Sequence, residues 1–452
     1  MQKIPVAMTI AGSDSGGGAG VQADLKTFAV MGVHGTSAIT SITAQNTREV
    51  RAIHDIPPDI VVSQIEAVAD DIGVDAAKTG MLSNSEIIRA VAKTIDKYGF
   101  PLVVDPVMVA KSGARLLRQE AIDTLKEVLI PRATIVTPNI PEAEVLTGVK
   151  IVDKQSQREA AKIIVEELGA RAAVVKGGHL GGGEALDILY HGGEFIELRG
   201  EKISRRTTHG TGCVFSAAIA AGLAKKRSIS DAVKVAKEVV TVAIKYGLEV
   251  GRGAGPVNPT AFQAIAAERW RVISSLKKAA EILKQEEEKV AKIIPEVQMN
   301  IAMSLPPLYA RSILDVAAFP GRIGRTGNRL VFKSDPEFGA SEHMARLVLA
   351  AQDYNPAIRS AANIKYKPEI IGIARELGLS VARVDRRREP LHVRSREGAT
   401  LPWMVTVAFE KYGRVPDIIY DEGDIGKEPM IRILAESAER VAEIITLIAR
   451  KL

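Results

Sequence analysis

The sequence predicts an α/β protein: a mostly parallel sheet with helices on both faces, joined by a helix to a second, smaller α/β domain. Three observations support this. The 452 residues are too many for one ordinary core. Strand-like and helix-like segments alternate through residues 1–255. The alternation resumes at residue 295 after a charged helical stretch. We therefore predict domains at 1–255 and 295–452 with a bridging helix at 256–294.

The predicted strands of the first domain are short apolar runs, and each ends in a polar or glycine motif. In a parallel sheet the carboxyl ends of the strands meet at one edge, where ligands bind. A site is expected there. The predicted strands are 6–10, 76–79, 102–105, 133–137 and 172–176; the predicted helices are 23–31, 157–168 and one that Ser83 or Asn84 caps and that runs to Tyr98.

The second domain follows a helical stretch at 259–293, which contains no glycine and becomes increasingly charged. This composition is typical of a bridging helix rather than a flexible linker. Beyond Pro295 the pattern predicts strands at 380–384 and 417–420, and helices at 341–354, 367–376 and 429–452.

Composition narrows the function classes. The net charge is +6, but basic and acidic residues are interleaved and aromatic residues make up only 4%, which disfavours nucleic-acid binding. Phosphorylated small molecules or a solvated surface explain the charge. One cysteine excludes a disulfide framework within the chain and favours a cytoplasmic protein. No apolar run has membrane-spanning length, so no membrane partner is expected. We expect a homo-oligomer, a dimer in the simplest case.

The single cysteine stands in the run His209-Gly210-Thr211-Gly212-Cys213, directly before a small, apolar segment. This pattern predicts a glycine-rich turn that opens a helix, where backbone N–H groups bind anions. A thiol in that field is expected to have a lowered pKa. The alternative is a small buried hydrophobe, and position alone leaves both open.

Other strand ends supply what phosphoryl transfer needs. The amides of Gly210-Thr211-Gly212 suit the charge of a transferred phosphoryl group. Glu142 and Asp105 suit Mg²⁺. Lys176 and Asn139 follow strands and suit ATP phosphates. Taken singly, Asn139 is equally well a helix cap, Glu142 a surface acid and Lys176 part of a turn; their joint order favours a site.

Seven segments in register resemble the hydroxymethylpyrimidine/phosphomethylpyrimidine kinases of the ribokinase superfamily. The resemblance covers residues 1–255 and implies a ribokinase-like fold, with two successive ATP-dependent phosphorylations that use Mg²⁺. The matching segments are 11–24, 44–47, 78–82, 105–108, Lys111-Ser112-Gly113, 137–142 and 209–213.

The same resemblance implies residue roles. Gln45 would bond the aminopyrimidine edge, because a side-chain amide both donates and accepts. Cys213 would act as the base where most of the superfamily has an aspartate. The pyrimidine pocket would be lined by Gly12, Asp24, Met81 and Val107.

Two patterns mark the second domain. In residues 320–325, Arg322 and Arg325 flank a glycine, which suits phosphate binding. In residues 336–346, Ser341 is predicted to cap a helix whose first turn holds His343. Spacing alone favours the simpler interpretation of a surface histidine and ordinary solvated charge.

Segments 320–323, 338–343, 361–366 and 426–432 are similar to the non-barrel thiamine-phosphate synthase domain that is often fused to these kinases. The resemblance implies condensation of the pyrimidine diphosphate with a thiazole phosphate, releasing pyrophosphate. Arg322 and His343 would be catalytic. Arg325, Ser341 and Lys427 would bind phosphate. Two alternatives stay open: a domain that senses thiamine phosphate, and a pyridoxal-type kinase.

Overall fold

The computed structural model describes residues 3–109, 116–117, 119–178 and 184–452. Its internal contacts divide the chain into two units, Met1–Gln263 and Ala264–Leu452. The division falls inside the long helix α9 (Ala261–Gln285), while the domain limits given above stay a prediction. Within the described ranges, no helix has both the length and the apolar character needed to cross a bilayer.

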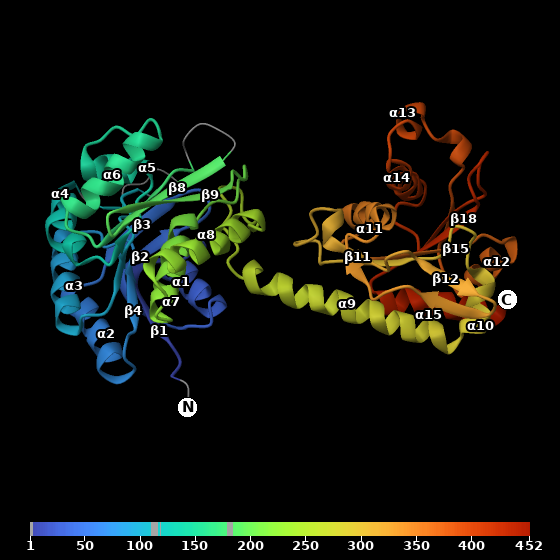
Figure 1. The fold of residues 1–452 in the computed structure, drawn as a ribbon, viewed down its shortest axis with the longest axis horizontal. Helices are drawn as coiled ribbons and strands as arrows, with labels where there is room; N and C mark the ends of the chain where they lie inside the picture. The colour runs from blue at the N-terminus through green and yellow to red at the C-terminus, as the bar shows by residue number, and fades with distance from the viewer. Residues whose placement is uncertain (1–2, 110–115, 118, 179–183) are drawn as a thin grey trace. The chain divides into compact units, whose positions relative to one another are not determined.

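A nine-stranded sheet forms the centre of the first unit (Figure 1). Its middle strands, from β2 to β7 in the sheet order, are parallel, and antiparallel strands lie at both edges. The order is β3-β2-β1-β4-β5-β6-β7-β8-β9. The strands are β1 (Val6–Asp14), β2 (His34–Gln45), β3 (Val50–Asp55), β4 (Ala76–Thr79), β5 (Leu102–Val104), β6 (Ile135–Val136), β7 (Ala172–Lys176), β8 (Glu184–His191) and β9 (Glu194–Glu201).

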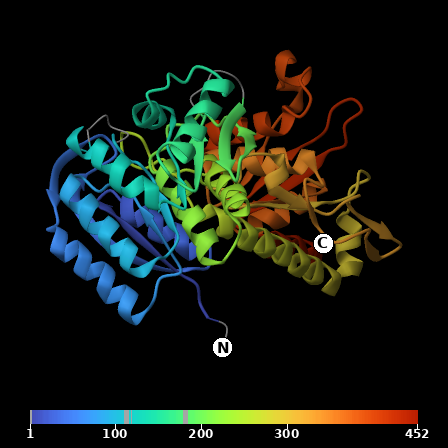
Figure 2. The same ribbon diagram turned by 60° about the vertical axis from the view of Figure 1, so that its left-hand side comes forward.

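Helices cover both faces of this sheet, as predicted (Figure 2). Alternate residues of β7 show the two faces: Ala173 and Val175 belong to one apolar cluster, Ala172 and Val174 to the other. The first cluster includes residues of α2 (Pro58–Asp71), α3 (Ser85–Tyr98), α4 (Gln119–Thr124), α5 (Ile140–Thr147) and α6 (Lys154–Glu166); the second includes α1 (Gly20–Val30), α7 (Thr211–Ala224) and α8 (Ile229–Lys245). Asn84 caps α3, as one of the two predicted caps.

A buried ion pair links α1 to the sheet. Lys78 Nζ of β4 lies 2.9 and 3.1 Å from the two carboxylate oxygens of Asp24, and Thr9 Oγ1 donates to the same carboxylate at 2.7 Å. Both charged side chains are fully buried. Burial alone would lower the pKa of Lys78, but the Asp24 carboxylate raises it above its ordinary value. Lys78 therefore carries a positive charge inside the domain.

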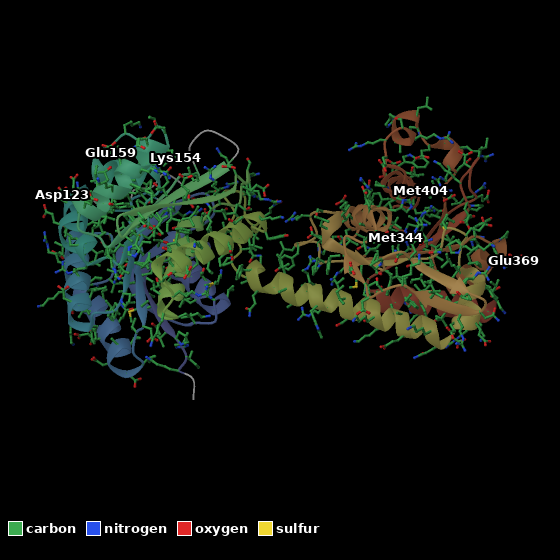
Figure 3. All side chains as sticks on the ribbon, viewed as in Figure 1. Asp123, Lys154, Glu159, Met344, Glu369 and Met404 are labelled. Carbon is green, nitrogen blue, oxygen red and sulfur yellow. The ribbon has the colours of Figure 1, made fainter. Side chains whose placement is uncertain are left out.

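The second unit has a seven-stranded, mostly antiparallel sheet in the order β14-β11-β10-β15-β18-β17-β16, plus the hairpin β12-β13. Met344 and Met404 belong to the apolar cluster of α11 and α14 (Figure 3). The strands are β10 (Ile301–Ser304), β11 (Val316–Ala318), β12 (Ile323–Thr326), β13 (Arg329–Phe332), β14 (Glu337–Phe338), β15 (Ser360–Lys365), β16 (Val381–Arg383), β17 (Ile418–Asp421) and β18 (Met430–Ala435); the α-helices are α10 (Glu287–Val290), α11 (Glu342–Tyr354), α12 (Pro368–Glu376), α13 (Leu391–Arg394), α14 (Thr400–Tyr412) and α15 (Ala438–Lys451).

One predicted helix of this unit is wrong. Residues 429–452 were expected to be helical throughout, but Met430–Ala435 is β18, which pairs with β15 and β17. All six of its residues are buried, and such a short apolar run fits a central strand as well as a helix. The helix begins only after Ser437, whose side chain accepts from the Arg440 amide. The other helices and strands predicted beyond residue 340 are confirmed.

Lys78→Met is expected to lower the free energy of unfolding of the first unit by about 3–5 kcal/mol, because it leaves Asp24 as an unpaired charge in the core. Urea denaturation measures the loss. The matched control replaces both partners, Lys78→Met with Asp24→Leu, and should recover most of the stability. A double variant as unstable as the single one would contradict this account.

Candidate active sites

A cavity of about 540 Å³ lies at the carboxyl ends of the parallel strands. Six of these strands contribute side chains at or just beyond their ends, as the sheet topology predicts. Most of the residues singled out from the sequence line it: Gly12, Gln45, Met81, Asp105, Val107, Asn139, Glu142, Lys176, Gly210, Thr211, Gly212 and Cys213. The motif Lys111-Ser112-Gly113 lies outside the described residues.

Asp24 is the exception. It was expected to line the pyrimidine pocket, but it is fully buried beneath the cavity. Its partner Lys78 lines the cavity in its place. Asp24 therefore acts on the site indirectly. It keeps the Lys78 side chain charged and in position at the cavity wall.

The start of helix α7 forms one wall of the cavity. The first helical hydrogen bond runs from the Val214 amide to the Gly210 carbonyl at 3.0 Å, so the amides of Gly212 and Cys213 precede it and face the end of the helix. Gly210 has φ +82°, and a β-carbon there would lie 1.9 Å from the Gly18 carbonyl oxygen. Only glycine fits, and the helix end stays open to an anion.

Asp14 ties the glycine-rich loop after β1 to this helix start. Its carboxylate accepts from the amides of Gly16 (2.8 Å), Gly18 (3.1 Å) and Ala19 (2.8 Å), and it lies 2.9 Å from His209 Nε2. Burial opposes the charge on Asp14, but the His209 contact and these amides hold its pKa below the ordinary value. Asp14 and His209 both stand inside the quoted motifs, yet spacing alone indicated no role for them.

The same histidine orients Gln45. One end of the Gln45 amide lies 3.2 Å from His209 Nε2, and the other lies 3.3 Å from Thr43 Oγ1. His209 Nε2 faces the Asp14 carboxylate and therefore carries a hydrogen, while the Thr43 hydroxyl donates to the Ser13 carbonyl at 2.8 Å. The structure places the amide nitrogen toward His209 and the amide oxygen toward Thr43, and these partners favour the flipped orientation, with the oxygen toward His209. One donor and one acceptor position of Gln45 remain for a ligand.

Cys213 does not have the lowered pKa expected from its place in the helix. Burial raises the pKa of the thiol to about 12; Lys78 counteracts this, whereas Asp24 and Asp105 raise the pKa further. A hydrogen bond from the Gly20 amide lowers it only in part. Cys213 is partly exposed at the cavity wall, but desolvation of its thiol and the charges of Asp24 and Asp105 together outweigh the helix end. At neutral pH the site holds a thiol.

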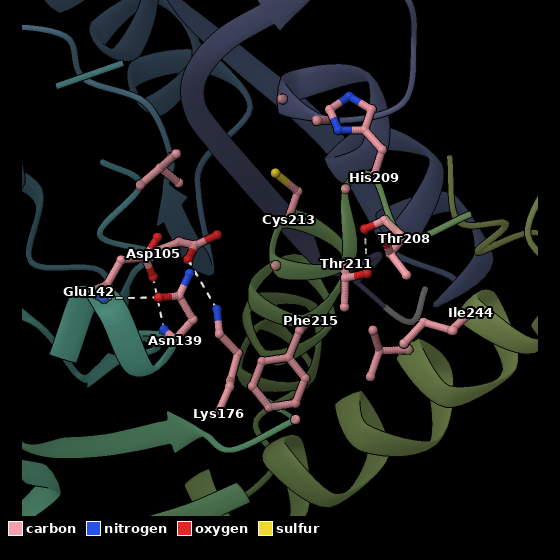
Figure 4. Close-up of a pocket in the computed structure, with 18 of the residues that line it drawn as sticks. Asp105, Asn139, Glu142, Lys176, Thr208, His209, Thr211, Cys213, Phe215 and Ile244 are labelled. Atoms are coloured by element: carbon pink, nitrogen blue, oxygen red, sulfur yellow. Dashed lines mark hydrogen bonds and ion pairs between the residues drawn. The ribbon is translucent and has the colours of Figure 1, made fainter. Parts of the chain in front are cut away.

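Charged side chains gather on the opposite wall (Figure 4). Lys176 Nζ lies 3.6 Å from Asp105 Oδ1. Asn139 caps α5 in a reciprocal box, with the Glu142 amide donating to Asn139 Oδ1 and the Asn139 amide donating to Glu142 Oε2, both at 2.9 Å. Burial raises the pKa of Glu142 to about 7, against the pull of Lys176 and with the help of Asp105. Asn139 is thus a helix cap, and Glu142 is buried rather than a surface acid.

Apolar residues line another part of the same cavity: Ile203, Phe215, Val240 and Ile244. None was singled out from the sequence. Val240 and Ile244 stand four residues apart in α8, and such spacing is typical of an ordinary core-facing stripe. No signal in the sequence distinguishes that stripe from a ligand-binding wall.

The second unit contains a cavity of about 300 Å³, lined by Arg322, Ser341 and His343 among others. Arg322 has φ +63° and donates to the Val297 carbonyl, and such backbone strain is typical of functional positions. Ser341 caps α11, as predicted. Arg325 and Lys427 lie outside this cavity: Arg325 is an exposed residue of β12, and Lys427 lies 3.8 Å from Glu389. Their predicted phosphate contacts are not supported here.

His343 is an exposed residue that lines this cavity together with three arginines. Local desolvation of the imidazole, followed by the charges of Arg432, Arg322 and Arg386, lowers its pKa to about 4. His343 is therefore neutral at pH 7. Arg386 and Arg432 line the cavity but were not predicted as ligands. Arg432 stands in one of the quoted motifs, whereas Arg386 opens a run of three arginines that looks like surface charge.

A doubly covered parallel sheet with an anion-binding helix start and carboxylates at its edge defines the first unit as a ribokinase-like phosphotransferase. Residues 14–258 match the family model of phosphomethylpyrimidine kinase, and the chain belongs to this family. Residues 275–446 match the model of the thiamine-phosphate synthase ThiN. The chain therefore combines a kinase domain and a synthase domain of thiamine biosynthesis.

Individual relatives are similar to the kinase half of the chain. The hydroxymethylpyrimidine/phosphomethylpyrimidine kinase of Bacillus subtilis is 49% identical over 57% of this chain and 95% of its own. The thiamine biosynthesis bifunctional protein ThiED of Geobacter sulfurreducens is 51% identical over 56% of this chain, and the match spans only 51% of that relative. An ADP complex of Bacillus subtilis pyridoxal kinase has a TM-score of 0.54 and 42% identity, covering 57% of this chain and 99% of that one.

Because Cys213 is the only cysteine, alkylation reports on it alone. With a pKa of about 12, the thiol is expected to react slowly with iodoacetamide at pH 7 and about tenfold faster with each pH unit up to pH 10. Mass spectrometry of the intact chain measures the rate, with free cysteine as the reference. A plateau at or below pH 8.5 would show a thiolate and contradict the effect of burial.

Proposed function

We propose that the first cavity phosphorylates hydroxymethylpyrimidine and then its monophosphate, and that the second cavity condenses the resulting diphosphate with hydroxyethylthiazole phosphate. The observation that supports this is the convergence in one cavity of an amide that both donates and accepts, an open helix start and a lysine–carboxylate wall. The second cavity supplies the arginines and the capped helix that phosphorylated substrates need.

The pyrimidine lies against Gln45 in this proposal. The amide offers a donor and an acceptor side by side, which matches a ring nitrogen next to an exocyclic amino group. Gly12, Met81 and Val107 provide the flat walls; a β-carbon at Gly12 would come within 3.3 Å of Met81 Sδ. Gly12 thus keeps a ring-sized space open.

The transferred phosphoryl group binds at the helix start, where the amides of Gly212 and Cys213 receive its charge. Phosphoryl transfer has a loose transition state, so the attacking hydroxyl loses its proton late. With a pKa of about 12, Cys213 is a neutral thiol and does not act as the base. Cys213 therefore positions the attacking hydroxyl, whose proton passes to an oxygen of the transferred phosphoryl group as the new O–P bond forms and the bond to the leaving ADP oxygen breaks.

ATP fits the rest of the cavity. Its adenine lies among Phe215, Val240 and Ile244, and its phosphates approach Lys176 and Asn139. Among the described residues there is no cluster of three or more potential metal ligands. Mg²⁺ suits such a site because it keeps its waters and takes phosphate oxygens, leaving Asp105 and Glu142 as the residues that hold it. When bound, Mg²⁺ offsets the charge that develops on the phosphates.

In the second cavity, the neutral His343 donates a hydrogen bond to a phosphate oxygen, and Arg322 supplies positive charge at the strained turn. The α11 amides beyond Ser341 bind a phosphate at the helix start. A domain that only senses thiamine phosphate would need the same contacts but no turnover.

Pyridoxal phosphorylation is a second candidate for the first cavity. The similarity to the Bacillus subtilis pyridoxal kinase structure supports it, at 42% identity. Pyridoxal has a single hydroxymethyl group that the same helix start would serve. Formation of pyridoxal phosphate at a rate equal to that of pyrimidine phosphorylation would favour this candidate.

Separate sites predict separable variants. Cys213→Ala is expected to reduce phosphorylation of hydroxymethylpyrimidine by at least about 100-fold while leaving condensation of supplied diphosphate intact. His343→Ala should do the reverse. His392→Ala, an exposed histidine of the second unit, is the matched control and should change neither activity. Liquid chromatography of the products measures both reactions. Loss of both activities in either variant would contradict two independent sites.

A further inference from the structure

We propose that Arg386 and Arg432, held in place by Asp421, form the binding site of the diphosphate in the second cavity. This inference rests on the proposed condensation and assigns its most highly charged group to residues outside those implied by the resemblance. The alternative ligand of the diphosphate is Arg322, which lines the same cavity.

Asp421 holds both guanidinium groups. Arg432 of β18 donates through Nη1 to Asp421 Oδ2 at 2.6 Å, and Arg386 Nη1 lies 3.9 Å from Asp421 Oδ1. The Asp421 side chain is fully buried, and those of Arg432 and Arg386 are only 5% and 11% exposed. One carboxylate between two arginines leaves a net positive charge and fixes both in place.

Arg386 has unused hydrogen-bonding capacity. Its Nε is buried, and no described residue accepts a hydrogen bond from it. A buried charged donor without an acceptor is costly, and such groups in native structures commonly mark a ligand site. Arg386 lines the cavity, so a bound anion would supply a counter-charge to this guanidinium group.

Arg322 differs from this pair in its exposure, its backbone and its lack of a carboxylate partner among the described residues. It is exposed, it stands on a strained turn, and it donates to the Val297 carbonyl, whereas Arg432 and Arg386 both lie beside Asp421. A diphosphate carries more charge than a monophosphate and gains more charge as it leaves, so fixed donors stabilise it best. We therefore assign the diphosphate to Arg386 and Arg432, and the monophosphate of the thiazole to Arg322.

The charged residues that act on His343 are three arginines: Arg432, Arg322 and Arg386. Glu428 also lines the cavity, but its carboxylate accepts from the amides of Glu296 and Val297. The side chains that line the cavity thus carry a net positive charge. A bound polyanion such as a diphosphate would neutralise it.

The test compares Arg386→Ala with Arg388→Ala, the matched control two residues away, whose side chain is 86% exposed. Steady-state condensation is measured on the full chain with supplied pyrimidine diphosphate and thiazole phosphate. Arg386→Ala should raise the KM for the diphosphate, and weaken inhibition by pyrophosphate, by about 10- to 100-fold, because charged hydrogen bonds are lost. The KM for thiazole phosphate should stay within about twofold. Arg386→Lys should recover part of the loss.

An Arg386→Ala variant whose two KM values are both unchanged, or are raised equally, would overturn the assignment, as would an Arg322→Ala variant that loses the diphosphate selectively. If the unmodified chain does not condense, the proposed synthase activity fails on its own. Titration with inorganic pyrophosphate then decides, with the first cavity filled by a non-hydrolysable ATP analogue. Weaker pyrophosphate binding by Arg386→Ala than by Arg388→Ala supports the proposed diphosphate site, and equal binding overturns it.

Discussion

The kinase site depends on one close approach of two backbones: the Gly18 carbonyl lies against Gly210 at the start of α7, with no room for a β-carbon between them. Asp14 secures this contact by accepting amides from the loop and by pairing with His209. The helix start proposed to bind the phosphoryl group and the Gln45 amide proposed to bind the pyrimidine both depend on this contact. Gly210 and Asp14 thus fix the positions of the α7 start and of the Gln45 amide.

In both units a buried carboxylate holds a lysine or arginine side chain at the wall of a cavity. Asp24 holds Lys78, Asp105 lies beside Lys176, and Asp421 braces Arg432. These pairs cost desolvation energy but place charge where phosphates bind. Burial is the main cause of the neighbouring pKa shifts, and these charges add to it: Asp24 and Asp105 raise the pKa of Cys213, and the arginines lower that of His343.

The sequence predicts the architecture well where local signals agree with burial. The strands at 76–79 and 172–176 and the caps Asn84 and Ser341 are confirmed residue by residue. Residues 429–435 were misassigned because a short, mostly apolar run, interrupted only by Arg432, has no clear period that distinguishes a strand from a helix. The site residues at strand ends could be placed because parallel topology brings them to one edge.

What escaped prediction depends on three-dimensional surroundings. The pKa of Cys213 follows from desolvation and from two carboxylates distant in sequence, not from the helix end beside it. Asp24 does not line the cavity. Its ion-pair partner Lys78 does, and Asp24 is fully buried. Arg386 is indistinguishable from its exposed neighbours until β17 brings Asp421 beside it.

The central claim is that one chain carries out consecutive steps whose intermediate is a pyrimidine diphosphate. The most direct measurement supplies the purified chain with hydroxymethylpyrimidine, thiazole phosphate, ATP and Mg²⁺ and follows the products by mass spectrometry. The account predicts that the monophosphate and then the diphosphate form and are consumed as thiamine phosphate and pyrophosphate appear. A diphosphate that accumulates without thiamine phosphate would contradict it.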